Sequence, residues 1–355
     1  MSNKRDILLT VVGLVAMFGF ACFAQLEMDS YMCRITNLCL IYAIIGLSMN
    51  ITNGFAGQFS LGQAGFMAVG AYVVGIFTVP VELRENVFYA VPMHPAIADI
   101  QFPLWLALLL GGLLSALIAF LIGTPVLRLR GDYLAIATLG FSEIIRIIIT
   151  NAQSITNGAL GIKDIPTIND VRLIFLITAV VFVFVTCLIN SSYGRAFKAI
   201  REDEIAAEAM GINLFRHKCL AFMISAFFAG IGGGLYATLL GTVDPKNFLF
   251  TLTYNFLLII VLGGMGSITG SMLGSIIVTA GLEYLRIFDE PLELFGTAIP
   301  LFRPGFRMVM FSVLLMACVL FWRKGIMGTE EFTWQKLIDF LKNPLKRFKQ
   351  KGAKL

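Results

Sequence analysis

The stretch SSYGRAFKAIREDEIAAEAMGINLFRHK, Ser191–Lys218, separates two strongly apolar runs of the chain. It holds nine charged residues around an Ala-rich centre that ends at Gly211. The range Tyr193–Gly211 is predicted to form a short helix, with Gly211 as a left-handed cap. A charged helix between apolar runs suggests a segment that meets a partner at a membrane face, although composition alone slightly favours a solvated connector.

The composition of the whole chain predicts a membrane protein with many helices. The chain has 355 residues, of which 58% are hydrophobic and 14% are charged, whereas a soluble domain carries about a quarter charged residues. The 31 Phe and 34 Gly fit helices that face lipid and pack closely on one another. The net charge of +5 does not indicate nucleic acid, because the basic residues sit beside the apolar runs. The six cysteines contain no CxxC pair, and small buried hydrophobes are their default role.

Ten apolar runs reach spanning length, at 7–26, 35–52, 61–79, 102–127, 133–150, 172–189, 219–240, 253–268, 271–288 and 307–322. We expect the first run to be an uncleaved helix, because twenty residues are long for a signal core. With the N-terminus inside, the inner segments hold 18 Lys and Arg and the outer segments hold seven. Because positive residues stay on the cytoplasmic side, both termini are predicted to be cytoplasmic.

Between the second and third runs lies NGFAGQFSLGQAG, at residues 53–65, with four glycines and several hydrogen-bonding side chains. Backbone freed at membrane depth must be satisfied by protein or by water in a cavity, so a solute path or gate is favoured here. A tight turn with close helix packing is the alternative. The candidate path residues in this stretch are Asn53, Gly57, Gln58, Ser60 and Gln63.

A second glycine-rich break, GGMGSITGSMLG, occupies residues 263–274. Gly270 and Gly274 have GxxxG spacing, which favours close packing of helices. The two breaks do not fall at corresponding places in two halves of the chain, so no internal repeat is inferred.

Glu143 and Arg146 lie three residues apart in the fifth run and therefore share one helical face. Charges within a span usually turn inward or pair. Glu143 is a candidate path residue, and an ion pair that only supports the fold is at least as well favoured.

Motifs of enzymatic chemistry are missing from the sequence. It contains no GxxxxGK[ST] phosphate loop, nucleophile elbow, HExxH motif or CxxC set. We therefore expect no catalysis by this chain, and a membrane enzyme is the weakest alternative.

Four segments in order resemble signatures of ABC importer permeases, and more narrowly of LivM-type permeases of branched-chain amino acid importers. They are the cytoplasmic coupling loop GRAFKAIREDEIAAEAMGIN at 194–213, the stretch 53–65, RLRGDYLAIATL at 128–139 and LGGMGS at 262–267. The resemblance covers about residues 35–325. Within the loop, Glu208-Ala209 and Gly211 look like a shortened EAA-type motif, whose usual Leu-Pro is replaced by Asn213-Leu214-Phe215.

The resemblance implies an all-α polytopic protein of about ten transmembrane helices, some broken, like a type II ABC importer permease. Its domains would be an N-terminal helix and short outer loop (1–34), a permease core with coupling loop 191–218 (35–325) and a basic cytoplasmic tail (326–355). It implies a multi-pass protein of the bacterial inner membrane, with a LivH-type permease, two cytoplasmic ATPases and a periplasmic or lipid-anchored binding protein as partners. ATP and Mg would bind to the ATPases, and no cofactor to this chain.

On this reading the coupling loop grips the ATPases, through Arg195, Arg201, Glu202, Glu204, Glu208, Ala209 and Gly211. The cargo would be Leu, Ile or Val. Urea, short amides or another small polar solute would use the same polar groups and stay open as alternatives. A secondary transporter or channel working alone is less favoured, because ionisable residues paired at mid-membrane are nearly absent.

Overall fold

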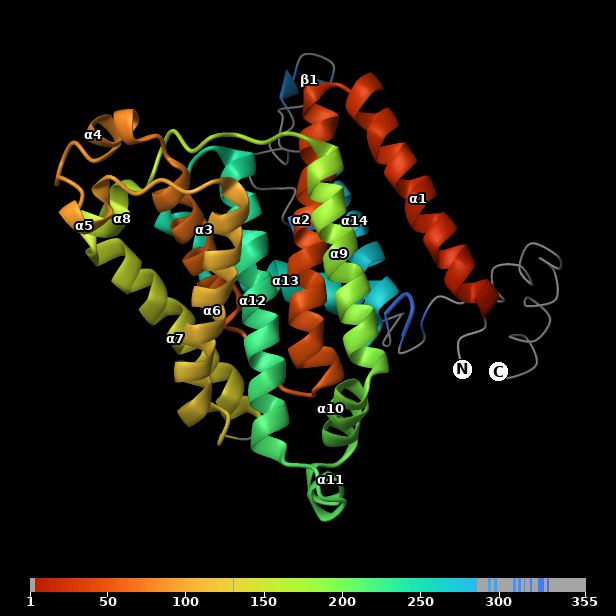
Figure 1. Ribbon diagram of the computed structural model, residues 1–355. Coiled ribbons are helices and arrows are strands. Elements are labelled where there is room, and N and C mark those ends of the chain that lie inside the picture. The colour runs from red at the N-terminus through yellow and green to blue at the C-terminus, as the bar shows by residue number, and fades with distance from the viewer. Residues whose placement is uncertain are drawn as a thin grey trace.

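The computed structural model describes residues 4–129 and 131–285, as well as 293–294, 297–298, 309–310, 312–313, 316, 320, 325–328 and 331. The described chain is almost entirely helical, as predicted (Figure 1). Its long helices are α1 (Lys4–Glu27), α2 (Ser30–Asn50), α3 (Gln63–Thr78), α6 (Leu104–Val126), α7 (Asp132–Asn151), α9 (Val171–Asn190), α12 (Leu214–Leu240), α13 (Phe250–Gly263) and α14 (Ile268–Tyr284).

Short elements connect the long helices. The short α-helices are α4 (Arg84–Val87), α5 (Pro95–Ala98), α8 (Gln153–Thr156), α10 (Ser192–Glu202) and α11 (Glu204–Ala209). One π-helix, η1 (Ile51–Phe55), extends α2, and three 3₁₀ turns are η2 (Val81–Leu83), η3 (Gly158–Leu160) and η4 (Pro245–Phe248). Within the described residues, β-structure is limited to an isolated bridge between Ile162 and Val243 and to the antiparallel pair β1 (Glu293–Leu294) and β2 (Thr297–Ala298).

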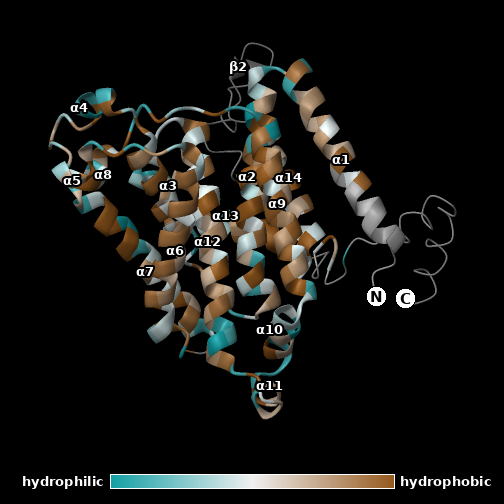
Figure 2. Cartoon of the chain, in the orientation of Figure 1, coloured by the Kyte–Doolittle hydropathy of each residue, from teal (hydrophilic) through white to brown (hydrophobic). Residues whose placement is uncertain are grey.

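Five helical stretches of the described chain are long and apolar enough to cross a membrane. They are Ser30–Phe55, Leu104–Val126, Asp132–Asn151, Val171–Asn190 and Leu214–Leu240. A sixth results if α3 and the segment Val81–Val87, bent by 99°, count as one span. Figure 2 shows that hydrophobic residues dominate these helices. The structure is therefore that of a polytopic helical membrane protein.

The predicted number of ten spans is not confirmed by the described residues and stays a prediction. The helices α13 and α14 coincide with predicted runs but have 14 and 17 residues. The predicted run 307–322 and the basic tail 326–355 lie largely outside the described residues, as does Arg130. The boundaries proposed for the three domains stay predictions.

The bundle has two different ends. Figure 1 shows α10 and α11 at one end, which we call the α11 end, and α4, α5 and α8 at the opposite end, which we call the α4 end. The connections 80–101 and 151–171 thus lie opposite the segment 191–218, as the predicted topology requires. At the α4 end, the buried Arg84 side chain donates hydrogen bonds to the carbonyl oxygens of Ile76, Val79, Ile97, Ala98 and Ile100.

The core forms where α3, α6 and α12 meet, and glycine sets how closely these helices approach. A β-carbon at Gly70 of α3 would overlap the carbonyl group of Gly230 in α12. A β-carbon at Gly230 would lie 2.5 Å from Ser115 Oγ of α6. Ser115 Oγ donates a 3.0 Å hydrogen bond to the carbonyl of Phe66. Backbone contact between small residues is the usual way in which membrane helices associate, because lipid is as apolar as the side chains.

Replacing Gly70 by Ala should destabilise the protein, because the new methyl group overlaps backbone that cannot rotate away. We expect a loss of about 1–3 kcal/mol or more, measured as a lower Tm of the detergent-solubilised chain. Gly140→Ala on α7 is the control, because no atom lies within 4 Å of its β-carbon position; it should leave Tm unchanged or raise it slightly. Equal Tm values for the two variants would contradict the packing described here.

Candidate coupling site

The charged stretch forms two helices, not the single helix predicted over Tyr193–Gly211. The helix α10 ends at Glu202, and Asp203 adopts an extended conformation with φ −158°. Its carboxylate accepts hydrogen bonds from the backbone N–H groups of Ile205 and Ala206, at 2.8 and 3.1 Å. An Asp with this geometry is a helix N-cap, so the polar side chain that interrupts α10 also begins α11. Gly211 has φ +83°, as predicted for a left-handed cap.

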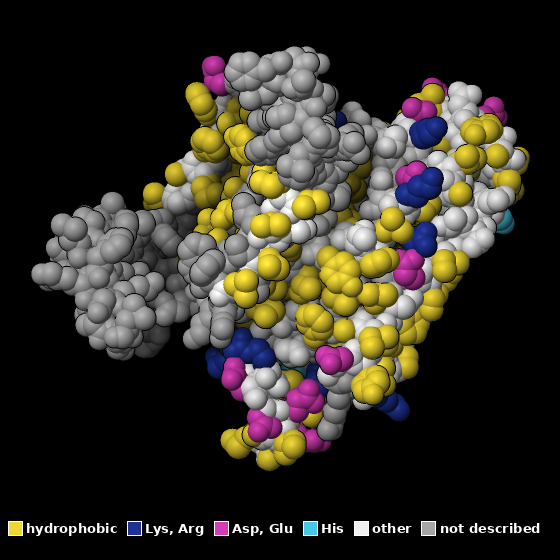
Figure 3. Space-filling model, turned by 180° about the vertical axis from the view of Figure 1, so that it is seen from behind, with side chains coloured by type: hydrophobic (Ala, Val, Ile, Leu, Met, Phe, Trp, Pro, Cys, Tyr) yellow, Lys and Arg dark blue, Asp and Glu magenta, His cyan; other side chains and the backbone are white. Residues whose placement is uncertain are grey.

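The tip of the α11 end combines exposed charges with exposed apolar side chains. Ile205 and Met210 are 76% and 83% exposed. The predicted coupling residues that are exposed around them are Arg195, Glu202, Glu208, Ala209 and Gly211. Figure 3 shows acidic, basic and hydrophobic side chains gathered at this lower end of the molecule. Large apolar side chains surrounded by charge at a protruding tip are typical of a protein-binding surface.

Two of the predicted coupling residues instead turn toward the protein. The Glu204 carboxylate accepts a 2.6 Å hydrogen bond from Lys218 Nζ, at the start of α12. The guanidinium of Arg201 donates from Nη1 to the carbonyl of Gly54, at 3.0 Å. Glu204 therefore ties α11 to the bundle, and Arg201 ties α10 to the end of α2. Their predicted contact with an ATPase stays a prediction.

The α11 end also contains both glycine-rich breaks. The chain leaves α2 through the π-helix Ile51–Phe55, and Lys198 Nζ of α10 lies 5.7 Å from the centre of the Phe55 ring. Gly57 and Gly266 have φ +66° and φ +88°. A β-carbon at either residue would lie 2.9 Å from an Arg201 side-chain atom. The helix α10 is thus packed against both breaks.

Asn50 joins the two breaks directly. Its side-chain oxygen accepts a 2.9 Å hydrogen bond from Gly266 N, and its side-chain nitrogen donates to Ser267 O and Ser271 Oγ at 2.8 and 2.7 Å. Asn50 is fully buried. The Asn50 side chain thus makes three of the four hydrogen bonds open to an amide. It holds the end of α2 against the start of α14.

A turn near the C-terminus also packs on the second break. The backbone N–H groups of Ile326 and Met327 donate to the carbonyls of Leu262 and Gly263, at 2.8 and 3.0 Å. The Glu331 carboxylate accepts from the backbone of Ile268 and Thr269 at the start of α14, at 2.7 and 3.2 Å. A carboxylate at a helix N-terminus is favourable both for the free N–H groups and for the helix dipole. The packing predicted for the GxxxG pair is confirmed, since α14 contacts α13 through Gly270 and Gly274.

Most of the predicted path residues are buried inside the bundle. Asn53 exchanges two 3.2 Å hydrogen bonds with the backbone of Ser60. Gln63 donates to Ser48 of α2, and Ser225 of α12 donates to Ser48 O at 2.8 Å. These groups satisfy one another, so they hold α2, α3 and α12 together. Two predicted path residues differ, since Gly57 is exposed at the α11 end and the Glu143 side chain is partly exposed.

Three polar groups near this network have buried atoms that lack a protein partner. Gln58 is 2% exposed, and neither its side-chain nitrogen nor its oxygen is hydrogen-bonded within the described structure. The same holds for Ser142 Oγ and Glu143 Oε1 on α7. Loop 56–62 and α7 are in contact, because Leu61 N donates to Thr138 Oγ1 at 3.0 Å. Buried polar atoms without a partner are rare and point to a bound molecule or water.

Glu143 and Arg146 form the predicted ion pair, with 2.7 Å between Oε2 and Nε. Their side chains are 25% and 26% exposed on a helix that otherwise shows isoleucines to the outside. Charged groups that are partly exposed within a span are unfavourable against lipid. This part of α7 therefore suits a polar cavity or a protein partner better than lipid.

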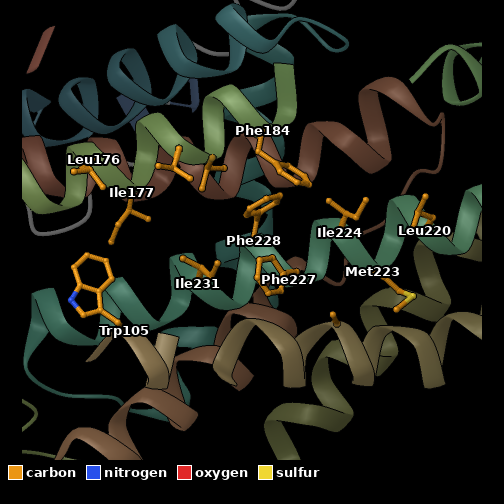
Figure 4. Close-up of a pocket in the computed structure, with 13 residues that line it drawn as sticks. Trp105, Leu176, Ile177, Phe184, Leu220, Met223, Ile224, Phe227, Phe228 and Ile231 are labelled. Carbon is orange, nitrogen blue, oxygen red and sulfur yellow. The ribbon is translucent and has the colours of Figure 1, made fainter. Parts of the chain in front are cut away.

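An apolar groove beside α12 is a poor candidate for a polar solute. It has a volume of about 540 Å³ and lies between α6, α9 and α12. Figure 4 shows Phe184 of α9 facing Phe228 of α12 across it, with Phe227 beside Phe228 and Trp105 at one end. Its lining holds no charged or amide side chain that would bind the head group of an amino acid.

Sequence reasoning missed several residues of the site, namely Ser48, Asn50, Gly54, Lys218, Ser225 and Glu331. Asn50 and Ser225 are polar residues inside or at the end of apolar runs, which is a usable signal. The role of Glu331 depends on a contact across 63 residues of sequence and has no local signal. No group of three or more possible metal ligands occurs among the described residues.

Comparison with known proteins identifies a family that this chain matches. Residues 31–320 match the family described as branched-chain amino acid transport system / permease component. The high-affinity branched-chain amino acid transport system permease protein LivM of Escherichia coli is 37% identical over 72% of this chain. The match spans 64% of the length of that relative.

More distant relatives are named for two kinds of cargo. The probable branched-chain amino acid transport permease protein LivM of Methanocaldococcus jannaschii is 27% identical over 80% of this chain and 89% of its own. The guanosine ABC transporter permease protein NupQ of Bacillus subtilis is 24% identical over 75% of this chain and 83% of its own. No solved structure matches the chain. With a family match that covers most of its length and a polytopic helical fold, the chain belongs to the family of branched-chain amino acid transport system permease components.

Proposed function

We propose that this chain is a transmembrane permease subunit of an ATP-driven ABC importer for branched-chain amino acids. It forms half of the translocation path, and a LivH-type permease supplies the other half. Two cytoplasmic ATPases bind ATP and Mg, and a periplasmic or lipid-anchored binding protein delivers the solute. The chain itself has no catalytic role. The observation that carries the proposal is the protruding α10–α11 unit, which presents Ile205 and Met210 outward while Arg201 contacts both helix breaks.

The proposed topology follows from the two ends of the bundle. The α11 end is cytoplasmic and meets the ATPases, and the α4 end faces the binding protein. The chain has about ten spans in the manner of a type II importer permease, lies in the bacterial inner membrane and has both termini in the cytoplasm. The excess of Lys and Arg in the segments of the α11 side supports this orientation.

The proposed path runs between loop 56–62 and α7. A branched-chain amino acid is a zwitterion, so its head group needs polar partners once it leaves water. Gln58, Ser142 and Glu143 have buried atoms without protein partners, and these atoms supply donors and acceptors. Closure of the ATPase pair would move α10–α11 and alternate access to this path.

The first test is transport by the complete complex in proteoliposomes. We expect ATP-dependent uptake of radiolabelled L-leucine when the binding protein is present, with competition by isoleucine and valine. Urea, acetamide and guanosine at the same concentrations should not compete. Competition by one of these three would assign the chain to another cargo of the same transporter class. Uptake by this chain alone, without ATP, would contradict the proposal and favour a channel or secondary transporter.

The tip of α11 should determine docking of the ATPases. Changing Ile205→Ser and Met210→Ser together removes two exposed apolar side chains, each of which contributes about 1.5–3 kcal/mol if fully buried. We expect at least about tenfold less ATPase to co-purify with the tagged chain. Tyr89→Ser is the control, because Tyr89 is 71% exposed and lies in the connection 80–101 of the opposite end. Unchanged co-purification in the double variant would place the ATPase contact elsewhere.

Two glutamines of the first break should respond oppositely to the same substitution. Gln58→Leu removes a buried amide without partners, so stability should be unchanged or rise by about 1–3 kcal/mol, while leucine uptake falls. The control Gln63→Leu breaks the contacts with Ser48 and Ser225, so it should lower Tm. Full uptake by Gln58→Leu would remove this residue from the path.

A further inference from the structure

We infer that Arg201 is a positioning residue that transmits movement of α10–α11 to both helix breaks, and that it does not contact the ATPase. This inference rests on the proposed function. It concerns how the force passes through the chain, not whether an ATPase binds.

The guanidinium of Arg201 is held from two sides. Its Nη1 donates to Gly54 O at 3.0 Å, and its Nε and Nη2 donate to Glu202 Oε1 at 3.1 and 2.6 Å. The Arg201 side chain is 28% exposed and that of Glu202 is 73% exposed. The planar fork of arginine can bind both acceptors at once, whereas a lysine ammonium lacks this geometry. The inner residue of the pair therefore contacts the break, and the outer one meets solvent or a partner.

Arg201 also lies close to the backbone of both breaks. A β-carbon at Gly57 would lie 2.9 Å from Arg201 Cγ and 3.0 Å from its Cα. A β-carbon at Gly266 would lie 2.9 Å from Arg201 Nη1. Contacts under 3.0 Å are too close for a real β-carbon, so both positions fit Arg201 because they are glycine. The Arg201 side chain therefore packs on both backbone segments and is bonded to the first at Gly54 O.

The breaks themselves are joined, so they respond together. A β-carbon at Gly54 would lie 2.6 Å from Gly266 N, and Asn50 bonds to that same N–H group. The π-helix Ile51–Phe55 is an irregular turn of the kind often found at functional sites. One step deeper, Ser48 of α2 binds Gln63 of α3 and Ser225 of α12. These contacts connect α10 with the two breaks and with α2, α3 and α12, and α3 carries loop 56–62 at its start.

The test compares Arg201→Met, Arg201→Lys and the control Arg216→Met in the complete complex. The Arg216 side chain is exposed at the same end, and its removal changes the charge equally. For each variant, co-purified ATPase, ATP hydrolysis and uptake of radiolabelled L-leucine are measured. Arg201→Met should retain ATPase within about twofold but lower uptake per ATP hydrolysed about tenfold or more, as expected for a lost hydrogen bond of a charged group. Arg201→Lys should give an intermediate ratio, and Arg216→Met the wild-type ratio.

The outcomes separate the inference from the proposed function. Wild-type uptake per ATP in Arg201→Met would overturn the inference alone, as would a parallel loss of ATPase and uptake. If Arg201→Met does not assemble, Arg201→Lys decides, because an unchanged ratio in an assembled Lys variant overturns the inference. A wild-type complex that binds no ATPase would refute the proposed function and the inference with it.

A double-mutant cycle tests the contact without transport. Gly266→Ala should lower Tm of the purified chain in the wild-type background, because its methyl group meets Arg201 Nη1. In the Arg201→Met background that clash is relieved, while the cost of φ +88° for a non-glycine residue is the same. A smaller loss in the second background supports the contact, and equal losses contradict it.

Discussion

Backbone polar groups at the two helix breaks lie where water is scarce, and they must be satisfied by protein. Asn50 binds the freed groups of Gly266 and Ser267, and Arg201 binds the carbonyl of Gly54. Glu331 caps the N-terminus of α14 beyond the second break. These three side chains come from α2, α10 and the C-terminal region. The same contacts that satisfy the breaks therefore tie distant parts of the chain to one another.

The rest of the bundle is rigid, because its helices pack in close contact. Close contacts between α3, α6 and α12 depend on glycines such as Gly70 and Gly230, whose backbones touch. Such interfaces tolerate little sliding, since packed interiors have few voids. The interrupted segments 51–62 and 264–267 lack the regular hydrogen bonds of an α-helix. A force applied at the α11 end is thus more easily absorbed at the breaks than in the core.

The two helices of the segment 191–218 differ in what their side chains contact. Ile205 and Glu208 of α11 and Met210, which directly follows it, are exposed where a partner is proposed to bind. In α10, Phe197 is fully buried and Arg201 contacts the breaks. Asp203 separates the two parts, because it ends one helix and caps the next. The proposed docking surface and the proposed link to the breaks therefore lie close together in sequence, on two consecutive short helices.

By itself, the sequence determined the class of the protein, the positions of most long helices, the two breaks and the charged coupling segment. These features depend on composition, hydropathy and glycine spacing, which are local properties of the chain. Tertiary structure decided which charged residues of that segment turn inward, and that Asn53, Ser60 and Gln63 bind neighbouring groups while Gln58 does not. It also decided that residues 50, 201, 266 and 331 act in one place. The orientation of a polar side chain depends on partners far along the chain, and no local pattern of residues carries that information.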